Sequence, residues 1–99
     1  MFQGKVVLIT GGTGSLGQAL TRRLLKNGVK TIRIFSRNEN KQIEMESEFH
    51  DDRLRFLLGD IRDKERLVRA TEGVDIVFHA AALKHVPKIE YNPFESIKT

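Results

Sequence analysis

The sequence predicts an α/β fold built on a doubly wound parallel β-sheet. Short apolar runs alternate with segments whose apolar residues recur at helical spacing, and this alternation is typical of strand–helix–strand units with parallel strands. The first run is apolar at every interior position, as expected for a strand that is buried on both faces. A glycine-rich loop joins this run to the first helical segment.

The first strand and the first helix carry the clearest patterns. Residues 5–10 contain Val-Val-Leu-Ile in succession, which predicts a buried strand. A helix is expected over 15–27 because its apolar residues share one face: Leu16, Ala19, Leu20 and Leu24. Gly28 then ends this helix.

The middle of the chain predicts a second strand over 31–35 and a polar helix over 39–50. The strand reads Thr-Ile-Arg-Ile-Phe, and residues 36–38 lead away from it. The helix is expected to turn three apolar side chains inward: Ile43, Met45 and Phe49. A third strand is expected over 54–58.

The last elements complete a repeating strand–helix pattern. Asp63 is a candidate N-cap for a helix that runs to about Thr71, and Gly73 closes it. A fourth strand is expected over 74–79, and Pro93 suits the first turn of a further helix. We expect residues 1–99 to form one domain, the N-terminal portion of a sheet that usually has about six strands or more.

Composition limits the classes of protein that the chain can represent. It has 99 residues, 39% of them apolar, and no cysteine, which excludes disulfide scaffolds, thiolate zinc sites and cysteine nucleophiles. No apolar run approaches the length of a membrane span. The first run leads straight into glycines rather than into a secretory cleavage site, so we expect a cytoplasmic protein.

The basic balance of the chain does not predict a nucleic-acid-binding protein. Lys and Arg number 17 against 13 Asp and Glu, which gives a formal net charge of +4. The cations are dispersed, acids interleave with them between 44 and 52, and aromatic residues are few. A nucleic-acid interface needs clustered cations and stacking aromatics, so most of these charges are expected on solvated helix faces.

The strongest functional signal is the glycine loop over 10–17. Gly11, Gly14 and Gly17 follow a G-x-x-G-x-x-G spacing between a buried strand and an amphipathic helix, the context of a Rossmann-type dinucleotide-binding fold. Gly11 would permit the turn, Gly14 would admit a pyrophosphate, and Gly17 would let the helix pack closely on the sheet. The helix start would offer N–H groups to the phosphates. The alternative is a tight strand–helix turn that needs small residues.

The end of the second strand predicts which dinucleotide is bound. NAD-dependent enzymes place a carboxylate there, whereas a nearby arginine accommodates the 2′-phosphate of NADP. The residues here are Ser36, Arg37 and Asn38, with Lys41 one turn further on. They favour NADP, although Glu39 is a carboxylate in the helix that follows. The alternative is that Arg37 is a solvated loop cation.

Three further groups follow the third and fourth strands. Asp60 could accept a hydrogen bond from the adenine amino group, with Ile61 against the ring, or could cap the following turn. Small residues after the fourth strand would let the cofactor lie close, or would simply pack: Ala80, Ala81 and Ala82. Lys84 could reach a diphosphate in the cleft or lie exposed in a loop.

The histidines do not predict a metal site. His50, His79 and His85 lack metal-ligand spacing with acids or with one another. His79 lies in an apolar strand and is expected to be a hydrogen-bonded core residue. The sequence also lacks a G-x-S-x-G motif, a P-loop lysine and a paired-carboxylate arrangement.

Several blocks together resemble the extended short-chain dehydrogenase/reductases of polysaccharide biosynthesis. They are the glycine loop 10–17, Ser36-Arg37 with Lys41-Gln42, Gly59-Asp60-Ile61-Arg62-Asp63, His79-Ala-Ala-Ala-Leu-Lys-His-Val-Pro87, Glu90-Tyr91-Asn92-Pro93 and Ile97-Lys98-Thr99. The resemblance covers essentially the whole chain and is closest to the inverting UDP-N-acetylglucosamine 4,6-dehydratases. The block over 79–87 is far more specific than the glycine loop.

This resemblance implies bound NADP and a UDP-sugar substrate in a homo-oligomeric enzyme. A hydride leaves the sugar C4, water is lost across C5 and C6, and the hydride returns to C6 with inversion at C5. The implied phosphate contacts are Thr13, Gly14, Ser15 and Leu16. Residues 36–41 would hold the 2′-phosphate, and 60–61 the adenine. Ala80 and Lys84 would lie along the cofactor, with Lys84 also near the substrate, and Thr99 would begin a further substrate contact.

The sequence departs from this family's pattern at two positions. Leu16 stands where phenylalanine is common, and Asn38 stands where aspartate is frequent. The family's catalytic Tyr-x-x-x-Lys is expected beyond Thr99, and Tyr91 is no substitute because Glu95 stands four residues later. These residues alone are therefore expected to be inactive and to supply the cofactor-binding half, with catalytic residues elsewhere.

Two alternatives to the dehydratase stay open. A UDP-N-acetylglucosamine 4-epimerase of the same superfamily would share the cofactor half but return the hydride to C4. His85 favours the dehydratase, because close epimerase-type relatives tend to carry glutamine there. The other alternative is a dinucleotide-binding fragment without catalytic activity.

Overall fold

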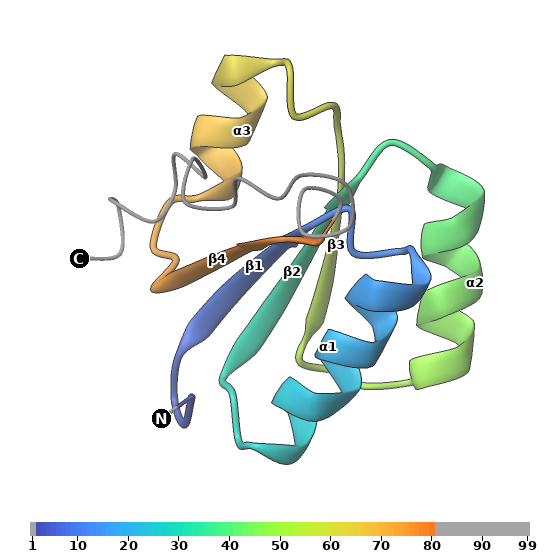
Figure 1. Ribbon diagram of the computed structural model, residues 1–99, viewed down its shortest axis with the longest axis vertical. Helices are drawn as coiled ribbons and strands as arrows, with labels where there is room; N and C mark the ends of the chain where they lie inside the picture. The colour runs from blue at the N-terminus through green and yellow to red at the C-terminus, as the bar shows by residue number, and fades with distance from the viewer. Residues whose placement is uncertain (1, 81–99) are drawn as a thin grey trace.

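The computed structural model describes residues 2–80, which form a parallel sheet with helices on both faces (Figure 1). The elements in chain order are β1 (Val6–Thr10), α1 (Ser15–Lys26), β2 (Thr31–Ser36), α2 (Glu39–Phe49), β3 (Leu54–Leu58), α3 (Lys64–Ala70) and β4 (Ile76–His79). The strand order is β3-β2-β1-β4, with every pairing parallel. This is the order expected for a doubly wound sheet, so the predicted Rossmann-type fold class is confirmed.

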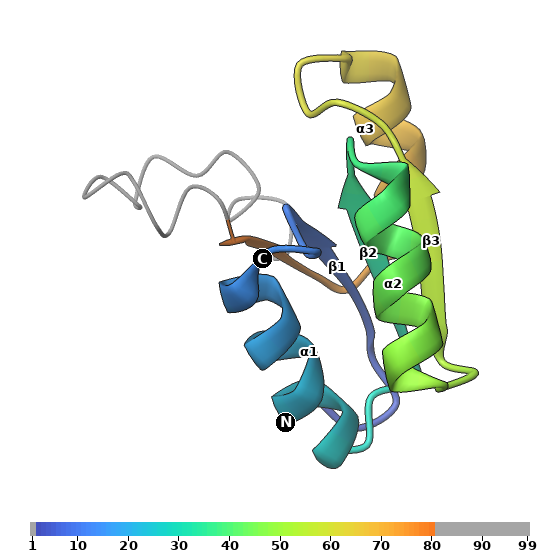
Figure 2. The same ribbon diagram turned by 90° about the vertical axis from the view of Figure 1, so that its right-hand side faces the viewer.

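Each face of the sheet has its own apolar core. On one face Leu24 of α1 and Met45 of α2 pack with Ile32 and Ile34 of β2, and Figure 2 shows α2 lying in front of β2 and β3. On the other face Leu67 of α3 joins a separate cluster. Strand β1 is buried between the two layers, since Val7, Leu8 and Ile9 are 0% exposed, and the predicted two-sided burial of this strand is confirmed.

The inward face of α1 agrees only in part with the predicted one: Leu24 is buried and Leu20 packs against the core, as predicted, but the other two residues do not face inward. Its buried residues are Gly17, Thr21 and Leu24, whereas Leu16 and Ala19 are exposed. Small residues occupy the inward positions because the first half of α1 approaches the glycine loop closely. The hydroxyl of Thr21 bonds within the helix, donating to the Gly17 carbonyl oxygen at 2.8 Å.

The inward face of α2 also requires a correction. Met45 is 1% exposed, as predicted, and Phe49 packs partly against the core. Ile43 was predicted to face inward, but its side chain is 57% exposed. The inward position is taken by Gln42, which is 7% exposed and lies on the same helix face as Met45 and Phe49, at spacings of three and seven residues.

Side-chain caps fix the ends of α3. The Asp63 carboxylate accepts a hydrogen bond from the Arg66 backbone N at 3.2 Å, which confirms the predicted N-cap. At the other end the Arg33 guanidinium of β2 donates to the carbonyl oxygens of Ala70 and Glu72, at 2.8 and 2.7 Å. Among residues 2–80, no helix is long and apolar enough to cross a membrane. The expected helix at Pro93 lies outside the described residues.

Candidate functional site

The loops that follow β1, β2 and β3 are joined at the carboxyl edge of the sheet. The backbone N–H of Gly11 donates to the Phe35 carbonyl oxygen at 2.8 Å, and that of Gly59 donates to the Ser36 carbonyl oxygen at 2.8 Å. These bonds continue the sheet ladder beyond the strands and hold the three loops side by side. Ligands of open α/β sheets bind at this edge.

A cleft of about 510 Å³ lies among these loops. Its lining residues are Thr10, Gly11, Thr13, Phe35, Ser36, Arg37, Asn38, Gly59, Asp60, Ile61 and Arg62. Residues predicted separately from the glycine loop and from the ends of the second and third strands therefore share one cleft.

The glycine loop has the geometry that its sequence predicts, with one refinement. Gly11 adopts a φ of +70°, a region that favours glycine, so its predicted role in the turn is confirmed. Gly17 packs closely, but against the loop rather than a strand: a Cβ there would lie 2.5 Å from the Gly12 Cα. At Gly14, in contrast, a Cβ would meet nothing nearer than the Gly11 carbonyl oxygen at 3.6 Å.

The start of α1 comes two residues after Thr13, which lines this cleft. Gly14 is the N-cap, and within residues 2–80 no side chain accepts a hydrogen bond there as a cap. The first turn carries no acidic side chain. Ser15 and Leu16 are exposed at this helix start. An uncapped helix N-terminus without acids favours an anion electrostatically.

The polar residues at the exit of β2 differ in their surroundings: two form hydrogen bonds with α2, and the third has an exposed side chain. The Ser36 hydroxyl is buried and accepts a hydrogen bond from the Gln42 Nε2 at 2.9 Å, so its own hydrogen remains available to a further acceptor. Asn38 is the N-cap of α2, because its Oδ1 accepts from the Lys41 backbone N at 3.0 Å. The Arg37 side chain, in contrast, is 72% exposed.

Asp60 is held by two arginines. Its Oδ2 lies 2.8 Å from the Arg62 Nη2 and 3.7 Å from the Arg37 Nη1. The Arg62 side-chain and backbone hydrogen bonds, together with the charges of both arginines, lower the pKa of the Asp60 carboxyl to about 2. Its Oδ1 also accepts from the Arg62 backbone N at 2.9 Å, so Asp60 does stabilise the following turn, the alternative considered above. Ile61 is 47% exposed in the same cleft.

Most residues after the fourth strand lie outside residues 2–80, the part of the chain that the structure describes. Ala80 is 3% exposed and belongs to the core on the α1 and α2 face, which agrees with the packing alternative for this alanine. The other predicted site residues of this part, Ala81, Ala82, Lys84 and Thr99, are outside the described residues.

His79 is a core residue, as predicted. It is 7% exposed, and its Nδ1 shares a hydrogen bond with the Thr10 hydroxyl. Burial lowers the pKa of the His79 imidazole below its usual value, because removal from water disfavours the charged form. His79 therefore supports the end of β1 from the neighbouring strand.

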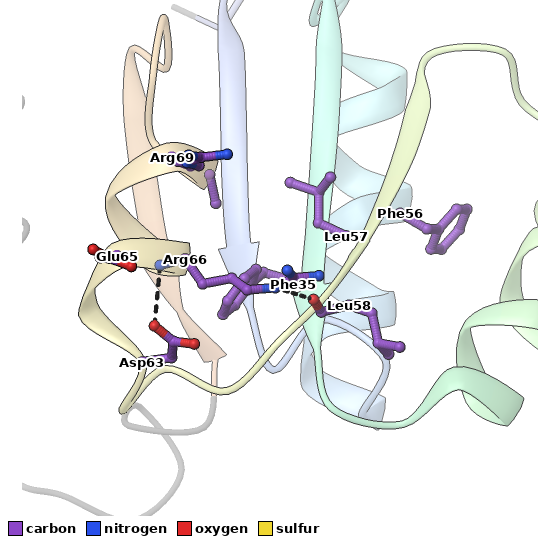
Figure 3. A pocket seen from close by; sticks show the side chains of 9 residues that line it. Phe35, Phe56, Leu57, Leu58, Asp63, Glu65, Arg66 and Arg69 are labelled. Atoms are coloured by element: carbon purple, nitrogen blue, oxygen red, sulfur yellow. Dashed lines mark hydrogen bonds between the residues drawn. The ribbon is translucent and has the colours of Figure 1, made fainter.

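A second cleft, of about 470 Å³, lies between β3 and α3 (Figure 3). The Phe35 ring lines both clefts, and a Cβ on Gly59 would lie 2.7 Å from its Cζ atom. The Arg66 Nε donates to the Leu58 carbonyl oxygen at 2.8 Å and ties α3 to the end of β3. This second cleft lacks the glycine loop, and the helix start that lines it, that of α3, carries the acids Asp63 and Glu65, which disfavour a phosphate there.

Two residues of the site were not predicted from the sequence. Gly12 forms the surface against which Gly17 packs, and a Cβ on Gly12 would lie 2.8 Å from the Ile34 Cγ2. Arg62 holds Asp60, as described above. The signals were present in the sequence: a fourth glycine in the loop, and an arginine two residues after a carboxylate at a strand exit.

Comparisons with known proteins agree with this geometry. A family of polysaccharide biosynthesis proteins matches residues 7–99. The chain is 57% identical over 100 residues to a UDP-N-acetylglucosamine 4,6-dehydratase (inverting) from Campylobacter jejuni, with 100% of this chain and 30% of the relative covered. It is 50% identical over 103 residues to a UDP-glucose 4-epimerase from Rickettsia conorii, with the same coverage of each chain.

A solved structure shows the same arrangement of the backbone. Pen from Bacillus thuringiensis superposes with a TM-score of 0.80 at 46% identity, covering 100% of this chain and 31% of that one. The chain thus spans about 30% of the length of the curated relatives it matches. The family match, the parallel sheet and the glycine loop together confirm the resemblance drawn from the sequence: this chain belongs to the polysaccharide biosynthesis protein family.

Proposed function

We propose that this chain supplies the NADP-binding part of a UDP-N-acetylglucosamine 4,6-dehydratase that inverts C5. The observation that carries the proposal is the cleft in which the glycine loop, the exposed Arg37 and Asp60 meet. The 57% identity to a dehydratase of that name, against 50% to a UDP-glucose 4-epimerase, supports the reaction.

The residues of the cleft fit the two anionic parts of NADP. The pyrophosphate would lie at the start of α1, where Gly14 carries no side chain and no side chain of residues 2–80 caps the first-turn N–H groups. The 2′-phosphate would lie beside Arg37, whose guanidinium can bind it with two parallel hydrogen bonds. The Ser36 hydroxyl hydrogen and the Lys41 ammonium are further donors at the same strand exit.

The roles that we assign within residues 2–80 are binding and orientation. When bound, NADP would supply the hydride acceptor that a 4,6-dehydratase needs. The glycine loop would fix the pyrophosphate, while Asp60 and Ile61 would orient the adenine from the β3 exit. The family's Tyr-x-x-x-Lys, expected beyond Thr99, would carry the proton transfers.

A UDP-sugar 4-epimerase is the second candidate function, favoured by the similarity to the Rickettsia relative. The test is to express the complete reading frame that contains this chain and to supply UDP-N-acetylglucosamine. We expect a 4-keto-6-deoxy product formed with loss of one water, identified by mass spectrometry and NMR. UDP-N-acetylgalactosamine as the product would overturn the dehydratase in favour of the epimerase, and NADP binding without conversion would favour the non-catalytic alternative.

A further inference from the structure

Arg62 is a charged residue of the cleft that the proposed function leaves without a role. Its side chain is 79% exposed and lines the same cleft as Arg37, although the two residues leave different strands. Both guanidinium groups face one carboxylate, that of Asp60. Two cations and one anion leave a surplus of one positive charge in the cleft.

The two arginines hold Asp60 unequally. The Arg62 Nη2 lies 2.8 Å from Oδ2, and its Nε lies 3.2 Å from both carboxylate oxygens. The Arg62 backbone N adds a fourth contact, at 2.9 Å to Oδ1. The Arg37 Nη1, at 3.7 Å from Oδ2, is beyond hydrogen-bond distance. Arg62 therefore occupies most of the accepting capacity of Asp60, and the Arg37 N–H groups stay available.

We propose that Arg62 is a positioning residue for cofactor choice: by occupying Asp60, it keeps Arg37 free to bind the 2′-phosphate of NADP. This inference rests on the proposed function, because it assumes that a dinucleotide occupies the cleft. Without Arg62, the Asp60 carboxylate would pair with Arg37 and neutralise it. The same carboxylate would repel the phosphate dianion and could accept a hydrogen bond from the 2′-hydroxyl of NAD.

The test is Arg62→Gln in the complete protein, with dissociation constants for NADP and NAD measured separately by calorimetry. The ratio of the NAD constant to the NADP constant should fall about three- to tenfold, the range between an exposed ion pair and a charge-assisted hydrogen bond. Arg23→Gln is the matched control. It removes the same charge from the last turn of α1, at the opposite end of that helix from the cleft, and should leave the ratio unchanged.

A double variant distinguishes an indirect, positioning role of Arg62 from direct contact between Arg62 and the 2′-phosphate. If Arg62 acts by occupying Asp60, adding Arg62→Gln to Asp60→Asn should leave the NAD-to-NADP ratio unchanged, because the carboxylate that Arg62 occupies is already absent. A further fall in the double variant would overturn the inference, because Arg62 would then touch the phosphate itself. An unchanged ratio in the single Arg62→Gln variant would also overturn it, with the proposed function intact. Failure of the unmodified protein to bind either dinucleotide would instead overturn the proposed function.

Discussion

Arg37 is the residue on which the proposed preference for NADP depends. Its side chain is 72% exposed, and within residues 2–80 its one ion-pair contact is the long one to Asp60. An exposed guanidinium with free N–H groups can bind a phosphate without first breaking strong internal bonds. Ser36 and Asn38, its neighbours, are instead engaged with α2 through Gln42 and Lys41.

Replacing Arg37 with glutamine should therefore weaken NADP binding selectively. Loss of a charge-assisted hydrogen bond of about 1.5–3 kcal/mol corresponds to a roughly ten- to hundredfold higher dissociation constant for NADP. Binding of NAD, which lacks the 2′-phosphate, should change by less than about twofold. Fluorescence titration of each reduced cofactor measures both constants. An equal loss for the two cofactors would show that Arg37 does not contact the 2′-phosphate.

His79 makes the stability of the fold depend on pH. Burial lowers the pKa of its imidazole in the folded chain below the usual 6.5, so the unfolded chain binds the proton more tightly. The free energy of unfolding consequently rises with pH up to about 6.5, and the contribution is lost as pH falls below that value through the folded pKa.

The pH dependence can be assigned to His79 by substitution. Between about pH 8 and about pH 5 the thermal midpoint of the complete protein should fall. The thermal midpoint of the His79→Gln variant should fall less, because the glutamine side chain does not titrate. A slope that is identical in the unmodified protein and in His79→Gln would contradict this assignment.

At the scale of elements, the glycine loop and α1 meet through backbone rather than through side chains. A Cβ on Gly17 would lie 2.5–2.6 Å from three backbone atoms of Gly12, and backbone cannot move aside as the end of a flexible side chain can. Gly14 is different, because its surroundings leave ordinary contact distance for a Cβ and its φ of −75° suits any residue.

Two alanine substitutions in the loop should consequently behave differently. Gly17→Ala should lower the free energy of unfolding by about 1–3 kcal/mol or more, as overpacking does. Gly14→Ala should cost less than about 1 kcal/mol yet weaken binding of both NAD and NADP, because the added methyl group would face the pyrophosphate. Urea denaturation and cofactor titration of the two variants measure these effects. Equal stability of the two variants would contradict the packing argument.

Helix α2 is fastened to the sheet by a polar side chain. The Gln42 Nε2 donates to the Ser36 hydroxyl and to the Leu57 carbonyl oxygen, each at 2.9 Å, and so joins the ends of β2 and β3. Buried polar groups that lose their partners cost free energy, so this residue stabilises the site as well as the helix.

Gln42→Ala should thus lower the free energy of unfolding by about 1–3 kcal/mol, because it removes the donor to both oxygens. Ile43→Ala, at the adjacent and largely exposed position, should change it by no more than about 0.5 kcal/mol. Chemical denaturation compares the two. A greater loss in Ile43→Ala than in Gln42→Ala would contradict the corrected inward face of α2.

At the scale of the whole molecule, the cleft is lined by residues that follow three different strands, and the sheet brings these residues together. They are separated by up to about fifty positions in the sequence, and the bonds from Gly11 to Phe35 and from Gly59 to Ser36 hold them in register. A ligand that contacts all three exits binds the folded sheet but not the unfolded chain, so its binding is linked to global stability.

NADP should accordingly raise the thermal midpoint of the complete protein more than NAD does at equal concentration. A ligand present at about one hundred times its dissociation constant stabilises the folded state by about 2.7 kcal/mol. Differential scanning fluorimetry with each cofactor measures the shifts, and Arg37→Gln should reduce the difference between them. An equal shift with NAD and NADP would contradict the proposed specificity.

Much of this molecule follows from local patterns in the sequence. The four strands and three helices described here occur where apolar runs and helical spacing predict them, with ends that differ by one or two residues. Asp63 and Gly11 also act as predicted, because an N-cap and a tight turn depend on residues close in the chain. Such features need no knowledge of distant contacts.

The tertiary structure decided the features that depend on distant contacts. In α2, periodicity predicts that Ile43 faces inward, but the helix packs against two strand ends through Gln42 instead. In α1, periodicity predicts that Leu16 and Ala19 face inward. The buried residues near the glycine loop are instead Gly17, which packs against Gly12, and Thr21. The pairing of Asp60 with Arg37 likewise joins two strand exits, which only the folded sheet brings within 4 Å. The sequence by itself thus determined the elements and the class of fold, because these follow from local spacing and hydrophobicity. The inward faces and the charge arrangement of the cleft were decided by the folded sheet, because they arise from groups that meet only across it.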